Sequence, residues 1–171
     1  MSNTIESLIA KQDITELIYR YMRGLDRWDD DLLRSLFTDD AWCEYGFMNG
    51  PANAFIDFAL GALSKHTANQ HMVGNILLEI EGDEAFGEVY FNAYHKVKTD
   101  NGVEDLIIAG RYLDRYEQRD GVWKFAYRSE VVDWSHSRPS NDTYFELAPD
   151  SLIGKRGDDA VYDRAARYKR A

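Results

Sequence analysis

Residues 87–97 read GEVYFNAYHKV, and apolar side chains recur there at every second position, as in a β-strand with one buried face. The same period of two recurs in residues 75–80, 104–118 and 122–134. The connecting sequences EGDEA, TDNG and RDG are rich in turn-forming residues. Because connections this short join antiparallel neighbours, the chain predicts a curled antiparallel sheet from about residue 71 onward.

The first third of the chain has helical spacing instead. Apolar residues recur every three or four positions over residues 5–26, which predicts a long amphipathic helix. A shorter helix is expected from Asp29 or Asp30 to Phe37, where the TDDA sequence ends it, and a third helix over residues 50–66. Helices followed by an antiparallel sheet predict an α+β domain in which the helices pack across one sheet face.

The composition fits one cytoplasmic domain that binds neither nucleic acid nor membranes. Of the 171 residues, 44% are apolar, and the formal charge of −10 opposes attraction to phosphate backbones or anionic lipid. Cys43 is the single cysteine, so no intrachain disulfide can form. We find no signal peptide and no apolar run near the roughly 20 residues of a membrane span. We take residues 1–136 as the domain and 137–171 as a C-terminal tail that could cover the pocket or an oligomer interface.

A sheet curled around a layer of helices can enclose a cavity, and one parity of each strand would line it. The alternation does not decide the inward parity of the last strand, where either Phe125 or the set with Arg128 and Glu130 could face the helices. Apolar walls with few polar groups suit a small hydrophobic molecule. The candidate ligand-binding residues are Val89, Phe91, His95, Ile108, Gly110, Tyr112 and Val132.

Asp26 interrupts the apolar face of the first helix. Ile18 and Met22 are four residues apart on that face, and the next step of four reaches Asp26, where an apolar residue is expected. His71 lies where the third helix hands over to the first strand, at the rim of the predicted cavity. A carboxylate that holds the Nδ1 proton of an imidazole orients the ring and favours its charged form, so the free nitrogen becomes a better base. Asp26 could instead cap the turn after its helix, and His71 could be purely structural.

Two further groupings remain open. Tyr21 lies five residues before Asp26, about 140° around an ideal helix, so it borders the same cavity only if the helix bends. Otherwise it is a core tyrosine. His66 and His71 could join Glu44 around a metal, but a spacing of five is not that of a helical ligand pair, and no third ligand is signalled. We therefore expect no metal and no cofactor.

These segments resemble SnoaL-like members of the nuclear transport factor 2-like superfamily, in the branch that holds scytalone dehydratase, bile acid 7-alpha-dehydratase and gamma-hexachlorocyclohexane dehydrochlorinase. The resemblance covers residues 5–135. It rests on the first helix ending in Asp26, the FTDDA segment at 37–41, the NQHMVGN segment at 69–75 and the closing hairpin at 114–128. The family's fold is a cone of curved antiparallel sheet closed by three helices around an internal cavity. The resemblance also implies a homo-oligomer, often a trimer, although dimers occur on this fold.

The resemblance implies a His–Asp dyad in which His71 is the base and Asp26 supports it. Tyr21 falls where the dehydrochlorinase has a lysine and the bile acid dehydratase has a tyrosine, which implies loss of water rather than of chloride. Arg128 falls on an arginine near the dyad, where it could stabilise enolate charge or pair with Glu130.

The sequence therefore predicts a cofactor-independent lyase, a dehydratase that takes a carbon-bound proton from a hydrophobic cyclic or aromatic-derived compound. An isomerase or cyclase of ketosteroid or polyketide type would use the same base without losing water. A noncatalytic ligand-binding module, similar to the small subunit of aromatic-ring dioxygenases, would need no base at all. The same fold hosts all three functions, so these alternatives remain open.

Overall fold

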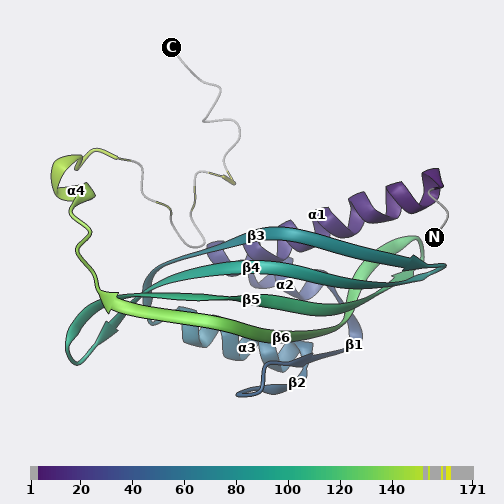
Figure 1. Ribbon diagram of the computed structural model, residues 1–171, viewed down its shortest axis with the longest axis horizontal. Helices are drawn as coiled ribbons and strands as arrows, with labels where there is room; N and C mark the ends of the chain where they lie inside the picture. The colour runs from purple at the N-terminus through teal and green to yellow at the C-terminus, as the bar shows by residue number, and fades with distance from the viewer. Residues whose placement is uncertain (1–3, 152–153, 155–158, 160, 163–171) are drawn as a thin grey trace, which may run out of the picture.

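The computed structural model describes residues 4–151, 154, 159 and 161–162. Three helices from the first part of the chain cover one face of a single curved sheet (Figure 1). This arrangement confirms the predicted α+β class and the cone-shaped, mostly antiparallel sheet.

All three predicted helices form, with bounds close to those expected. α1 spans Ile5–Arg27 after Thr4, whose hydroxyl accepts a backbone N–H of the first turn. α2 spans Asp30–Ser35, and the Asp29 side chain caps it in the same way. α3 spans Ala52–Leu63. These caps fix where each helix starts and therefore which of its residues face the sheet.

Six strands form the sheet, in the order β2-β1-β6-β5-β4-β3. β1 and β6 run parallel, whereas the other neighbouring strands pair antiparallel. The last four strands are those that the period of two predicts, and the short β2 was not predicted. The strands are β1 (Phe37–Glu44), β2 (Asn49–Pro51), β3 (His66–Glu81), β4 (Glu84–Thr99), β5 (Gly102–Arg119) and β6 (Val122–Pro139).

Two predicted boundaries are wrong, because pairing along the sheet extends the strands into sequence with turn propensity. The FTDDA segment begins β1 rather than ending α2, since Phe37 pairs with Phe125 of β6. β3 already begins at His66, so His71 lies within a strand, opposite Ala93, and not at a junction between helix and strand. Backbone hydrogen bonds to a neighbouring strand outweigh local preference here.

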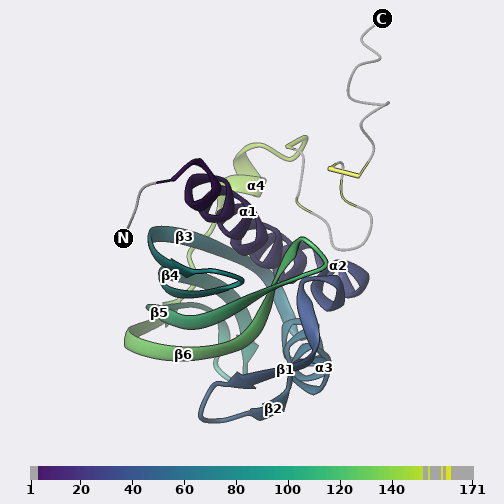
Figure 2. The same cartoon turned by 90° about the vertical axis from the view of Figure 1, so that its right-hand side faces the viewer.

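The core lies between α1 and the concave face of the sheet, which curls beneath the helix (Figure 2). Gly24 allows α2 to approach α1 closely, because a Cβ at this position would lie only 2.7 Å from the Leu33 side chain. The curl brings the C-terminal end of α1 against β3. The C-terminal end of α1 and the first part of β3 therefore lie against each other.

β6 is followed by the short helix α4, Tyr144–Leu147. Described residues of the tail contact the end of α1: Arg27 pairs with Asp159 at 2.9 Å, and the Tyr162 hydroxyl donates to Asp29 at 2.8 Å. Most of the predicted tail from residue 152 onward lies outside the described residues, so its role stays a prediction. Among the helices described, none combines the length and the apolar character that crossing a bilayer requires.

Candidate active site

Asp26 and His71 lie in direct contact where α1 ends over β3. The Nδ1 atom of His71 lies 2.7 Å from Oδ1 of Asp26, and the two side chains are only 7% and 12% exposed. The Asp26 carboxylate also accepts the backbone N–H of His71 at 3.0 Å and the side-chain amide of Asn69 at 2.9 Å. Since a carboxylate only accepts hydrogen bonds, Nδ1 carries the proton and Nε2 is the free basic nitrogen.

The strand positions explain how the dyad forms. Asn69 and His71 are two residues apart on β3, so both side chains point to the same sheet face, toward α1. Asp26 occupies the apolar row of α1 and is carried against that face with the rest of the row. Three separate donors satisfy the mostly buried acid, which offsets the cost of removing it from water.

Arg128 lies fully buried beneath the cavity and pairs with Asp114 rather than with Glu130. Its Nε and Nη2 atoms donate to the two oxygens of Asp114 at 2.8 and 2.7 Å. Burial opposes the charge of Arg128, but the Asp114 carboxylate outweighs it and holds the pKa of the guanidinium well above its usual value. The guanidinium carbon lies 4.2 Å from the ring centre of Tyr21 and 4.1 Å from that of Tyr112.

Tyr21 borders the cavity with its hydroxyl 2.9 Å from the hydroxyl of Tyr45. Tyr45 in turn stacks on Phe55, with ring centres 4.0 Å apart. Burial raises the pKa of both phenols above the usual value, even though the Arg128 charge acts in the opposite direction. Both hydroxyls therefore keep their protons at neutral pH and can serve as donors.

The dyad opens onto a mostly apolar cavity of about 190 Å³. A cavity of roughly 150 Å³ is large enough to hold benzene, so this volume suits a single substituted ring. The lining comes from α1, the β1–β2 loop, α3 and the four long strands. It comprises Tyr21, Leu25, Tyr45, Phe47, Phe55, Phe58, Ala59, Ala62, Leu63, His66, His71, Phe91, Ala93, His95, Ile108, Tyr112, Glu130 and Val132.

Five of the seven predicted ligand-binding residues line this cavity, namely Phe91, His95, Ile108, Tyr112 and Val132. Val89 and Gly110 do not. Val89 is fully buried in the core. Gly110 sits at a bulge between β5 and β6, where a Cβ would lie 2.1 Å from the carbonyl oxygen of Val131. Its missing side chain makes room for the neighbouring strand and not for a ligand.

Sequence reasoning did not assign a role in the site to three polar residues, although it named Glu130 as one that could face the helices. Asn69 carries a findable signal, because it precedes His71 by one strand repeat. Glu130 shares its parity with Arg128 and lines the cavity. Tyr45 carries no such signal, because its position depends on stacking against α3.

The metal alternative receives no support from Glu44, which is exposed and hydrogen-bonds to Tyr127 outside the cavity. Among the described residues, no group of three histidine, cysteine or acidic side chains could hold a metal ion.

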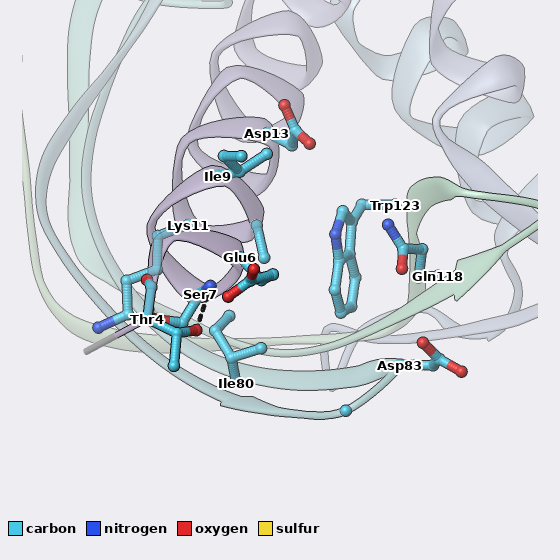
Figure 3. Close-up of a pocket in the computed structure, with 12 residues that line it drawn as sticks. Thr4, Glu6, Ser7, Ile9, Lys11, Asp13, Ile80, Asp83, Gln118 and Trp123 are labelled. Carbon is cyan, nitrogen blue, oxygen red and sulfur yellow. Dashed lines mark hydrogen bonds between the residues drawn. The ribbon is translucent and has the colours of Figure 1, made fainter. Parts of the chain in front are cut away.

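A larger cavity, of about 570 Å³, lies between the start of α1 and the turns that join β3 to β4 and β5 to β6. Figure 3 shows Trp123 opposite the first turns of α1, with Glu6 and Ile80 nearby. None of the dyad residues lines it. We place the candidate active site in the smaller cavity because His71 lines it and holds its contact to Asp26 there.

Residues 6–129 match the SnoaL-like domain family. Over 137 residues the chain is 28% identical to the gamma-hexachlorocyclohexane dehydrochlorinase of Sphingobium indicum, a match that covers 76% of this chain and 85% of that enzyme.

Solved structures agree at the level of the fold. A type 2 hexachlorocyclohexane dehydrochlorinase superposes with a TM-score of 0.72 at 23% identity, over 80% of this chain and 93% of that one. A protein from Novosphingobium aromaticivorans assigned as a scytalone dehydratase superposes with a TM-score of 0.69 at 23% identity, over 79% and 93% of the two chains. At these identities the likeness supports the shared cone fold and nothing finer.

Proposed function

The chain belongs to the SnoaL-like domain family, and from this premise we propose that it is a cofactor-independent lyase that removes water from a small, largely apolar cyclic compound. Its similarity to a dehydrochlorinase supports a lyase-type enzyme at the level of the family. The observation that carries the finer proposal is the contact between His71 and Asp26 at the wall of an apolar cavity.

In the proposed reaction, Nε2 of His71 takes a proton from a ring carbon that a neighbouring carbonyl group acidifies. The electron pair left on carbon forms the new double bond as the adjacent C–O bond breaks. Tyr21 gives its hydroxyl proton to the departing oxygen, so the group leaves as water. Asp26 holds the imidazolium in place, and the proton on His71 later returns to Tyr21 and resets the site.

Arg128 has an indirect role in this proposal, through its contact with the ring of Tyr21. Its guanidinium is already committed to Asp114, and it faces the ring of Tyr21. A cation in that position stabilises the phenolate that Tyr21 becomes when it donates its proton. Arg128 therefore supports the acid rather than touching the substrate.

A tyrosine at position 21 favours loss of water over loss of chloride. A phenol is a neutral proton donor suited to a hydroxyl leaving group, whereas chloride leaves without a proton. This reasoning separates the proposed reaction from that of the dehydrochlorinase relative.

A suitable test substrate is 3-hydroxycyclohexanone, a single-ring β-hydroxy ketone whose dehydration gives cyclohex-2-enone. The wild type should produce the enone, which is followed by its absorbance and by the loss of one water in the mass spectrum. His71→Ala should abolish turnover, whereas His136→Ala, on an exposed part of β6, should leave it unchanged. Retained turnover in His71→Ala contradicts the assignment, and a product of unchanged mass points to isomerisation or cyclisation.

We also propose a cytoplasmic homotrimer. Size-exclusion chromatography with light scattering measures the mass directly, and a monomer or dimer would contradict the trimer.

A further inference from the structure

Glu130 is a polar group of the cavity that the proposed reaction does not use. It lies on β6 opposite Tyr112 of β5 and shares its strand parity with Arg128 and Val132. The dyad stands on the other side of the cavity, because His71 belongs to β3, at the far edge of the same curved sheet. Glu130 is therefore the single carboxylic acid among the described residues that line the cavity, whereas His71 belongs to a different strand of its wall.

The carboxyl of Glu130 forms no hydrogen bond and no close ion pair with the residues that the structure describes. Every other carboxylate near the cavity is engaged: Asp26 holds His71, and Asp114 holds Arg128. Glu130 is half-buried, and its side-chain oxygens are not among the fully buried polar atoms that lack a partner, so they remain accessible to a ligand or to water. Glu130 lines the cavity, so a ligand bound there would lie against its side chain.

The surroundings of Glu130 favour its neutral form. Burial raises its pKa to about 7, although the charges of Arg128 and His71 act to lower it. Tyr112, directly opposite on β5, interacts with Glu130 as well, and burial raises the pKa of its phenol, so it stays uncharged. Tyr21, Tyr45, His66 and His95 line the same cavity. A neutral carboxyl group carries one O–H donor, whereas a carboxylate can only accept hydrogen bonds.

We propose that Glu130 is the specificity-determining residue of the cavity, and that its protonated carboxyl donates a hydrogen bond to an oxygen of a neutral ligand. This inference rests on the proposed function and narrows its substrate class. The compound is a single ring that carries a carbonyl or hydroxyl oxygen on the side that faces β6, away from the carbon that faces His71. Its size follows from the cavity volume of about 190 Å³.

The test is a comparison of two probes, acetophenone and ethylbenzene. They have nearly the same shape, but only acetophenone carries an oxygen that can accept a hydrogen bond. Neither has a leaving group, so binding is measured without turnover, and failure of the lyase proposal would not affect the result. Affinities are measured by NMR titration with the full chain at about pH 5.5 and about pH 8.5, on either side of the Glu130 transition.

At the lower pH the wild type should prefer acetophenone by about fivefold, the usual worth of one hydrogen bond. The preference should vanish at the higher pH, where the carboxylate repels the carbonyl oxygen. Glu130→Ala should abolish the preference at both values. Glu130→Gln should keep it at both, because the amide donates at any pH. Glu79→Gln, which changes an exposed carboxyl on β3, serves as the matched control and should behave as the wild type.

A preference that survives in Glu130→Ala, or that does not change with pH in the wild type, overturns the proposal. Failure of acetophenone to bind the wild type overturns it as well. Glu130→Gln guards against misreading a folding defect, because it retains the size of the side chain while removing only its ionisation.

Discussion

Replacing Asp114 by asparagine tests the buried ion pair beneath the cavity. Arg128 and Asp114 are both fully buried and share two hydrogen bonds, of 2.8 and 2.7 Å, and the Tyr116 hydroxyl donates to the same carboxylate at 2.7 Å. An amide keeps the size of the side chain but removes its charge, so the guanidinium stays buried without a counter-ion. Removing one partner of a buried pair costs about 3–5 kcal/mol, and we expect the free energy of unfolding to fall by that amount.

The protein contains a matched control for this substitution. Arg111 and Asp133 form a second two-pronged pair between the same two strands, with both hydrogen bonds at 3.1 Å. Their side chains are 29% and 41% exposed, so water and salt screen the attraction. Asp133→Asn should therefore cost less than about 1 kcal/mol.

Urea denaturation near neutral pH, followed by tryptophan fluorescence, measures the free energy of unfolding of the wild type and both variants. The dependence of the free energy of unfolding on urea concentration should have the same slope in all three proteins, since neither substitution changes the surface exposed on unfolding. If Asp114→Asn loses no more stability than Asp133→Asn, burial does not set the strength of the Arg128–Asp114 pair, and the reasoning about this pair is wrong.

Three further predictions concern the site and its frame. Glu130→Gln should become more stable than the wild type as pH rises, because the pKa of Glu130 is raised from 4.5 to about 7 in the folded protein. The stability that the wild type gains from protonating Glu130 is present in full below pH 4.5 and is lost as pH rises through 7, a change of about 3 kcal/mol in the free energy of unfolding. Urea denaturation at several pH values measures the difference between the two proteins, and a difference that does not vary with pH would contradict this prediction. Asp26→Asn should lower kcat about ten-thousandfold, as loss of an orienting carboxylate does in a serine protease, and unchanged kcat would remove Asp26 from the mechanism. Gly110→Ala should lower the free energy of unfolding by about 3 kcal/mol, because its Cβ would lie 2.1 Å from a backbone oxygen, whereas Gly61→Ala, on an open helix surface, should raise it by about 0.5–1 kcal/mol; equal effects in thermal unfolding would refute the clash.

The sheet and the helices were predictable because each carries its own periodicity. A period of two over residues 87–97 persists whatever the strand pairs with, and the caps at Thr4 and Asp29 act within one helical turn. The FTDDA segment was not predictable, because its strand character comes from β6, more than eighty residues later in the chain. Local signals fail where a distant partner decides the conformation.

Some residues of the candidate site were predictable from the sequence, and others were not. Asp26 was visible as a break in an apolar row, and the family resemblance joined it to His71. Asp114 was not predicted as the partner of Arg128, because the nearer Glu130 offered a carboxylate on the same strand. The pairing depends on the register between β5 and β6, in which Asp114 lies directly opposite Arg128. A single sequence does not state that register.

Asp26 was also interpreted as a possible cap of the turn after its helix, but the hydrogen bonds of its carboxylate go to β3. Its carboxylate joins the last turn of α1 to β3 through Asn69 and through both the backbone and the ring of His71. The same carboxylate therefore helps to hold the end of α1 on the sheet and holds the imidazole through its Nδ1 atom. In the proposed reaction, one acid therefore joins the helix to the sheet and also orients the base, and such a prearranged pair is what acid–base catalysis requires.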